Sequence, residues 1–335
     1  MKTLLLILSR LLLLLATVWG AGLLWYQITP WWLCGGLMLV WSVLCGLVWR
    51  GLAQGVINRR MLPWAVGFVA LWFFWLGLKP SHDRPWADDV AQLLHADVAG
   101  QLVTLHNVRD FEWRSQTDYV PRWITQTYDV SQIESADLIL SYWMGPAIAH
   151  TLISFGFADG QRLVFSLEIR KEEGEQFSAL GGFFKQFEAV VIAATEEDIV
   201  RTRSNVRGED VFLYRLNVPA ADLRMLFQEY VAKAQAIQQT PQYYHTLTSN
   251  CTTIVYDLAK KIVPLPLDYR LLLSGYFAEY AYDLNGLVPG YDYATLYERG
   301  HINQRALAND HQPEQSFAEA IRVGVPVRAP KTSQP

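Results

Sequence analysis

The feature that most restricts the fold of this chain is a set of three long apolar runs within its first 80 residues. The runs cover about residues 4–26, 31–50 and 61–78, and each approaches the roughly 20 residues that cross the hydrocarbon core of a bilayer. Nine of the thirteen tryptophans lie in this part of the chain, several of them near the ends of runs, as in an interfacial belt. We therefore expect residues 1–80 to form a transmembrane region of three helices.

The basic residues predict the orientation of these helices. Lys2 precedes the first run, and Arg50, Arg59 and Arg60 lie between the second and third, whereas the loop between the first two runs has no basic residue. The positive-inside rule then places the N-terminus and the 50–60 loop in the cytoplasm, and everything after the third run outside it. A cleaved signal peptide is the alternative for the first run, and it leaves the large domain on the same side.

The remainder of the chain reads as one α+β domain over residues 81–325, followed by a short polar tail, 326–335, that we expect to be disordered. Alternating patterns predict strands at 137–143, 188–194 and 210–218 and a hairpin over 151–170, and a 3.6-residue period predicts a helix at 220–239. The chain has a net charge of -4 and no basic stripe, which argues against a nucleic-acid partner. It has no metal-ligand motif, so we expect no metal or cofactor.

Cys251 is the one cysteine outside the apolar runs. Cys34 and Cys45 are eleven residues apart, about 16 Å along a helix, which is too far for a disulfide. An unpaired thiol is unusual in an oxidising compartment. Asn250 precedes a segment with helical spacing, so Cys251 falls in a first helical turn, where the helix dipole favours a thiolate and backbone N–H groups can bind an oxyanion.

Cys251 is therefore a candidate nucleophile, with Asn250 as helix cap or oxyanion contributor; the alternative is a small buried core residue. A thiolate nucleophile needs a base and an orienting group. His150 opens the predicted hairpin, and Glu168 interrupts its apolar second strand, so the hairpin can bring imidazole and carboxylate together. His245, six residues before the cysteine, is the competing base. The alternative for His150 is a structural role, as a buried histidine with its hydrogen bonds satisfied inside the core.

Two arginines are weaker candidates for binding a lipid phosphate. Arg201 and Arg203 follow the predicted start of a helix at Thr195, and together they could hold an anionic head group. A solvated helix face is the simpler interpretation of these arginines.

Several segments together resemble the Lnb N-terminal periplasmic domain family, over roughly residues 82–325. They are "RPWADDVA", "NVRDFEWRSQTDY", "AHTLISFGFADG", "LVFSLEIRKE", "SNCTT" and "RGHINQRALAND". The order of histidine, strand acid and helix-start cysteine also resembles circularly permuted papain-like enzymes such as lecithin-retinol acyltransferase. The family's name implies that its domain precedes the membrane part, whereas here the apolar runs come first.

This resemblance implies a bacterial inner-membrane protein whose periplasmic domain acylates the N-terminal amine of lipoproteins, with Cys251 as nucleophile, His150 as base and Glu168 as orienting acid. Three functions remain open on the sequence: a membrane-anchored cysteine acyltransferase acting on lipoproteins or lipids, a cysteine peptidase or amidase with the same residues, and a non-enzymatic envelope assembly module. An apolar pocket for a long chain favours the first, and an open polar groove favours the second.

Overall fold

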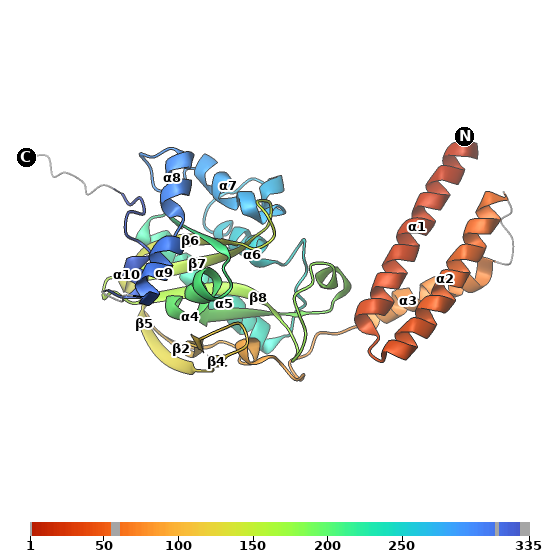
Figure 1. The fold of residues 1–335 in the computed structure, drawn as a ribbon, viewed down its shortest axis with the longest axis horizontal. Coiled ribbons are helices and arrows are strands. Elements are labelled where there is room, and N and C mark those ends of the chain that lie inside the picture. The colour runs from red at the N-terminus through yellow and green to blue at the C-terminus, as the bar shows by residue number, and fades with distance from the viewer. Residues whose placement is uncertain (1, 55–60, 312–314, 329–335) are drawn as a thin grey trace, which may run out of the picture. The chain divides into compact units, whose positions relative to one another are not determined.

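The computed structural model describes residues 2–54, 61–311 and 315–328. It divides into two compact units (Figure 1). The first extends to His82 and also takes in Phe177–Glu188, and the second comprises Asp83–Gln176 and the chain from Ala189 onward. The sequence predicted one uninterrupted domain from residue 81, so the excursion at Phe177–Glu188 is a difference between expectation and structure.

The first unit contains three apolar helices: α1 (Lys2–Gln27), α2 (Trp31–Ala53) and α3 (Leu62–Gly77). By length and composition α1 and α2 could cross a membrane, whereas α3, with 16 residues, is shorter. Spanning by α3 therefore stays a prediction. Of the basic residues that set the predicted orientation, Arg59 and Arg60 lie outside the described residues, as does the side chain of Lys2.

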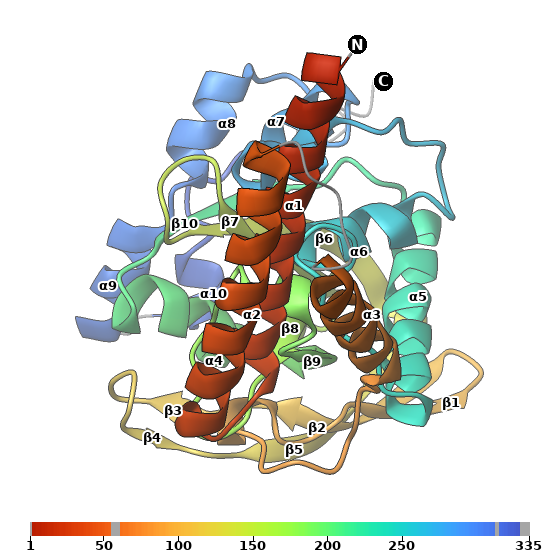
Figure 2. The ribbon, with the colours of Figure 1, turned by 90° about the vertical axis from the view of Figure 1, so that its right-hand side faces the viewer.

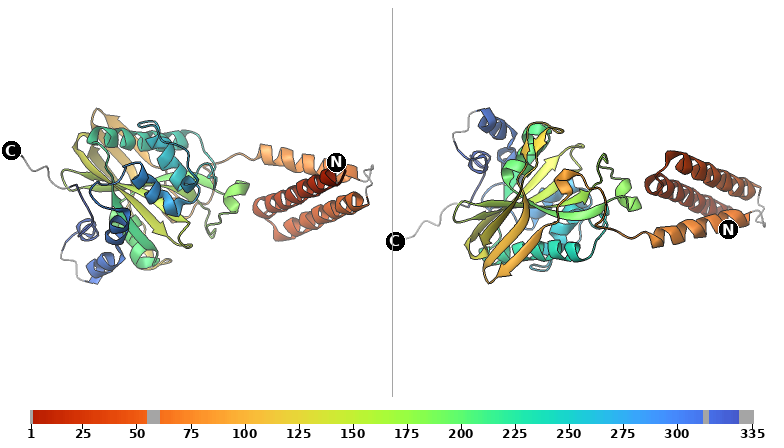
Figure 3. Two further views of the ribbon diagram at one scale, coloured as in Figure 1. Left: turned by 90° about the horizontal axis from the view of Figure 1, so that it is seen from above. Right: turned by 90° about the horizontal axis from the view of Figure 1, so that it is seen from below.

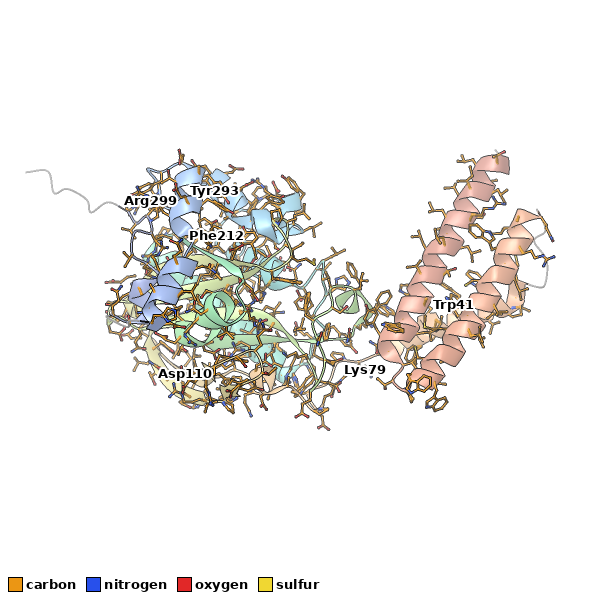
Figure 4. The ribbon with its side chains drawn as sticks, viewed as in Figure 1. Trp41, Lys79, Asp110, Phe212, Tyr293 and Arg299 are labelled. Carbon is orange, nitrogen blue, oxygen red and sulfur yellow. The ribbon has the colours of Figure 1, made fainter. Side chains whose placement is uncertain are left out.

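Trp41 on α2, which is labelled in Figure 4, contacts α1. Its indole Nε1 donates a hydrogen bond to the carbonyl oxygen of Thr17 on α1 at 3.1 Å. The ring lies over Gly20, where an added Cβ would come within 2.6 Å of it. Most leucines of α1 point outward and are exposed, as in a helix surrounded by lipid.

The second unit is built on one mixed eight-stranded sheet with the order β1-β2-β9-β8-β7-β6-β10, in which β5 pairs with β2. β2 and β9 are parallel, whereas β7 is antiparallel to both β6 and β8. The strands are β1 (His95–Ala99), β2 (Leu102–Arg109), β5 (Trp123–Asp129), β6 (Ile133–Tyr142), β7 (Ala149–Phe157), β8 (Arg162–Arg170), β9 (Glu188–Ala194) and β10 (Asp210–Arg215). A separate hairpin pairs β3 (Glu112–Trp113) with β4 (Tyr119–Val120).

Helices cover both faces of this sheet (Figures 2 and 3). One face carries α4 (Glu196–Arg201), the π-helical turn η5 (Thr202–Val206), α9 (Asn303–His311) and α10 (Phe317–Ala320). The other carries α5 (Ala220–Gln239) and α6 (Cys251–Ala259), and α7 (Phe277–Asp283) and α8 (Tyr293–Gly300) follow them in the chain. On α5, Phe227 packs edge-to-face against Phe155 of β7 and Phe165 of β8. The core is thus formed in the middle of the sheet, around β7 and β8.

The α+β class predicted from the sequence is confirmed, with a mixed sheet behind apolar N-terminal helices. The strand predicted at 188–194 coincides with β9, and Thr195 caps α4 by accepting a hydrogen bond from the Asp198 N–H. The strand predicted at 210–218 ends earlier, at Arg215. Most of the predicted tail, residues 329–335, lies outside the described residues.

Candidate functional site

Cys251 is the first residue of α6, and it is 8% exposed. Asn250 is the N-cap: its side-chain oxygen accepts hydrogen bonds from the N–H groups of Thr252 (2.9 Å) and Thr253 (2.8 Å). The hydroxyl of Thr253 in turn accepts from the Asn250 N–H at 2.8 Å, which completes a capping box. The sequence therefore begins a helix at the cysteine, and the thiol lies at the positive end of the helix dipole.

His150 and Glu168 come together across the β7–β8 pair. The Nε2 atom of His150 lies 3.0 Å from Oε1 of Glu168 and 2.7 Å from Oγ of Ser166. Ser166 donates its own hydroxyl proton to Glu168 at 2.9 Å, so its oxygen is free to accept from Nε2–H. These contacts hold the proton on Nε2 and leave Nδ1 for another partner.

Cys251 lies near enough to His150 for the two groups to shift each other's pKa. Burial raises the pKa of the Cys251 thiol. The charge of His150, a hydrogen bond from His150 and the backbone N–H of Thr151 lower this pKa, and together they outweigh burial. The net direction is downward, so a thiolate is favoured. None of the three cysteines, all of which are described, is in a disulfide.

His150 shifts in the direction that complements the thiol. Burial and the positive charge of Arg203 lower the pKa of His150, but Glu168 and Cys251 outweigh them and raise it to about 9. For Glu168, burial raises the pKa, whereas His150 and Arg203 lower it well below its usual value. The three shifts together favour a thiolate on Cys251, an imidazolium on His150 and a carboxylate on Glu168.

Arg203 is a member of this cluster rather than a surface group. Its guanidinium is buried and donates to Glu168 (3.0 Å) and to Glu209 (3.3 Å), and Glu209 also accepts from the hydroxyl of Ser141. The binding of a lipid phosphate by Arg203 stays a prediction, and the structure has both Nη atoms donating to carboxylates inside the domain. Its charge limits how far the pKa of His150 rises.

Arg201 also contacts protein groups, and its role at a head group stays a prediction. It forms a two-point ion pair with Asp310, at 2.6 and 2.8 Å, and donates to the carbonyl oxygen of Trp113 at 3.0 Å. His245, the competing base, uses Nδ1 to accept hydrogen bonds from its own turn, at Leu247 and Thr248. The structure thus brings Cys251, His150 and Glu168 together and turns Nδ1 of His245 toward its own loop.

Tyr244 adds a group that the sequence did not single out. Burial and the charges of Cys251 and Glu168 raise the pKa of its phenol, while a hydrogen bond from the backbone N–H of Cys251 opposes them. The hydroxyl therefore lies at the N-terminus of α6, beside the thiol. Nδ2 of Asn250 donates one of its two hydrogens to the carbonyl oxygen of Thr246 at 2.6 Å, and an oxyanion role for this side chain stays a prediction.

A cavity of about 970 Å³ shares Glu209 with the cluster. Charged and aromatic side chains line it together, among them Arg207, Glu279, Tyr142 and Tyr297. Phe212 and Tyr293, which are labelled in Figure 4, belong to the same lining. Among the described residues, no group of three or more His, Cys, Asp or Glu side chains is arranged to hold a metal ion.

Fold and site together define a periplasmic α+β domain that is carried on N-terminal apolar helices and has a buried cysteine–histidine–glutamate cluster. Residues 119–275 match the model of the Lnb N-terminal periplasmic domain. The resemblance read from the sequence is confirmed, and the match contains His150, Glu168 and Cys251. No curated protein and no solved structure matches the chain.

Proposed function

We propose that this protein is a membrane-anchored periplasmic cysteine acyltransferase that works through a thioester on Cys251, with lipoproteins or membrane lipids as substrates. The observation that carries the proposal is the pairing of a thiol at a helix start with an imidazole whose other nitrogen is held by a carboxylate. This arrangement supplies a nucleophile, a proton carrier and an orienting acid. The match to the Lnb N-terminal periplasmic domain supports the same activity, and the relation to permuted papain-like enzymes remains part of the proposal.

The first half-reaction would move an acyl group onto sulfur. The Cys251 thiolate attacks the carbonyl carbon of an acyl ester, and the tetrahedral oxyanion forms beside the N-terminus of α6, where the Tyr244 hydroxyl is a candidate donor. As the C–O bond breaks and the C–S bond remains, the imidazolium of His150 gives its Nδ1 proton to the departing alkoxide.

The second half-reaction would release the acyl group to an amine. Neutral His150 accepts a proton from the attacking amine, the C–N bond forms, and the C–S bond breaks to restore the thiolate. Glu168, with Ser166, keeps Nε2 protonated and the ring in place throughout. The proton that His150 takes from the amine restores the imidazolium, so the catalytic cycle needs no cofactor.

A peptidase or amidase remains the second candidate, because of the cavity that shares Glu209 with the cluster. Its mixed charged and aromatic lining suits a polar substrate better than a long aliphatic chain. The chemistry on sulfur is the same, and water replaces the amine as acceptor.

The test is the mass of the Cys251 peptide. We expect full-length protein in native lipid, or after exposure to phospholipid or a lipoprotein, to carry a fatty acyl group on Cys251 that neutral hydroxylamine removes. Variants Cys34→Ala and Cys45→Ala should keep the adduct, which controls for acylation of cysteines in the apolar helices. Cleavage of envelope peptides with no acyl adduct from any donor would favour the peptidase and contradict the transferase.

A further inference from the structure

The segment Phe177–Glu188 leaves the second unit after β8 and returns to it at β9, yet it belongs to the compact unit of the apolar helices. It contains one short 3-10 helix, η4 (Gly181–Phe184). We propose that this segment is embedded in the periplasmic leaflet of the membrane, where Leu180 and Phe177 contact lipid. The chain would then contact the membrane a second time, through the connection between β8 and β9.

The first support is the packing of Phe184 on α1. Its ring stacks on Tyr26, with ring centroids 5.5 Å apart and planes inclined by 13°. The same ring covers Gly22 so closely that an added Cβ would come within 2.2 Å of it. Gly22 lies five residues before the end of α1, about 7 Å along the helix axis, so Phe184 reaches more than one turn below the helix end.

Polar contacts fix the segment at the same helix end. The side-chain amide of Gln27, the last residue of α1, donates to the carbonyl oxygens of Phe184 (2.7 Å) and Lys185 (3.0 Å). The hydroxyls of Tyr26 and Ser178 lie 3.2 Å apart. Backbone carbonyls that leave regular structure at membrane depth need such partners, because lipid offers none.

Lys185 connects the segment to α3. Its ammonium donates to the carbonyl oxygen of Trp75 at 2.8 Å and lies 4.6 Å from the centre of the Trp75 ring. Trp75 is in the last turn of α3, where a cation complements the helix dipole. A tryptophan paired with a lysine is typical of the boundary between hydrocarbon and head groups. The segment is thus held at the depth of that boundary.

The exposed side chains of the segment indicate what surrounds it. Leu180 is 62% exposed and Phe177 is 44% exposed. They are exposed although the same segment is held to α1 through Phe184 and to α3 through Lys185. Trp25, next to Tyr26 on α1, is 65% exposed. Large apolar side chains presented at the end of apolar membrane helices match an interfacial lipid environment, and they match water poorly.

The test uses the full-length chain in liposomes and does not depend on catalysis. In a background with Cys34, Cys45 and Cys251 replaced by alanine, Leu180→Cys is labelled with an environment-sensitive fluorophore. The matched control is Leu307→Cys on α9, an exposed leucine (43%) of the second unit. Phosphatidylcholine–phosphatidylglycerol vesicles contain either a nitroxide near the top of the acyl chain or a water-soluble nitroxide outside.

We expect lipid-borne nitroxide to quench the label at Leu180 at least about twofold more than the label at Leu307, as burial of 5–10 Å into the interface requires. The water-soluble nitroxide should show the reverse order. Equal quenching at both positions by the lipid-borne nitroxide, or preferential quenching of the Leu180 label from water, would overturn the proposal. Either result leaves the thioester chemistry of Cys251 untouched, because the background lacks that thiol.

Discussion

Replacing Cys251 by serine is expected to abolish acyl transfer and the acyl adduct. The environment that favours a thiolate does not ionise a hydroxyl, whose proton is held far more tightly than that of a thiol. The cap at Asn250 and the start of α6 should survive the change, since they depend on the side chains of Asn250 and Thr253. The measurement is the initial rate of transfer from a labelled donor to an amine acceptor.

Replacing His150 by alanine should reduce the same rate by about 10² to 10⁴-fold, the usual loss when a general base is removed. The matched control is His245→Ala, which removes a histidine six residues from the cysteine whose Nδ1 serves its own turn. We expect that variant to transfer at close to the wild-type rate. A loss in His245→Ala as large as in His150→Ala would contradict the assignment of the base.

The largest effect on stability is expected at Arg322, which follows α10. Its guanidinium contacts Asp137 at 2.8 Å and Glu196 at 2.5 Å, and both carboxylates are completely buried. Burial raises the pKa of Asp137. The charges of Arg322 and Arg215 lower this pKa and outweigh burial, so the carboxylate stays charged. Arg322→Met removes the guanidinium that contacts both acids and should cost about 3–5 kcal/mol. Asp137 keeps its ion pair with Arg215, but the buried carboxylate of Glu196 loses its ion pair with Arg322.

In a thermal unfolding experiment on the full-length protein in detergent, this loss corresponds to a midpoint lower by about 6–20 °C for a domain of this size. Arg299→Met is the control, because Arg299 lies exposed in the last turn of α8 (Figure 4) and should change stability by less than about 0.5 kcal/mol. Equal midpoints for the two variants would show that the buried cluster does not hold the helices to the sheet.

The sequence was sufficient for those parts of the site that depend on local structure. Asn250 and Cys251 could be assigned to a helix start because capping residues act within one turn. Glu168 stood out because a charge in an apolar strand needs a partner, and His150 because the hairpin of β7 and β8 brings distant residues into register. These signals concern neighbours in the chain or across one turn, which patterning describes well.

The other members of the cluster depend on contacts that patterning does not encode. Arg203 lies in the π-helical turn η5 after α4, and its guanidinium contacts Glu168 inside the domain. Ser166 resembled any small strand residue, and Tyr244 any aromatic in a loop. A strand acid with only one histidine for a partner could have suggested a buried cation, but which arginine supplies it is decided by tertiary packing.

The course of the chain at Phe177–Glu188 was hidden for a similar reason. The stretch "FSALGGFF" has no long apolar run, so hydropathy does not mark it as part of a membrane unit. Its contacts are made with Gly22, Tyr26 and Trp75, which are more than a hundred residues away in the chain. Short apolar turns that pack on helix ends can be recognised only from a three-dimensional structure.

The pH dependence of Cys251 alkylation tests the central claim, an activated thiolate, without knowledge of the substrate. In the Cys34→Ala, Cys45→Ala background, the iodoacetamide rate should rise with a midpoint below the ordinary thiol pKa of about 8.5. The imidazolium of His150 keeps the thiolate paired until the histidine loses its proton near its pKa of about 9.

In the His150→Ala variant the attraction that lowers the pKa is gone and the effect of burial remains, so the midpoint should move above about 8.5. This upward shift is the result that the account predicts. A wild-type midpoint at or above about 8.5 that stays in place in His150→Ala would mean that Cys251 is an ordinary buried thiol, and the proposed chemistry would not stand.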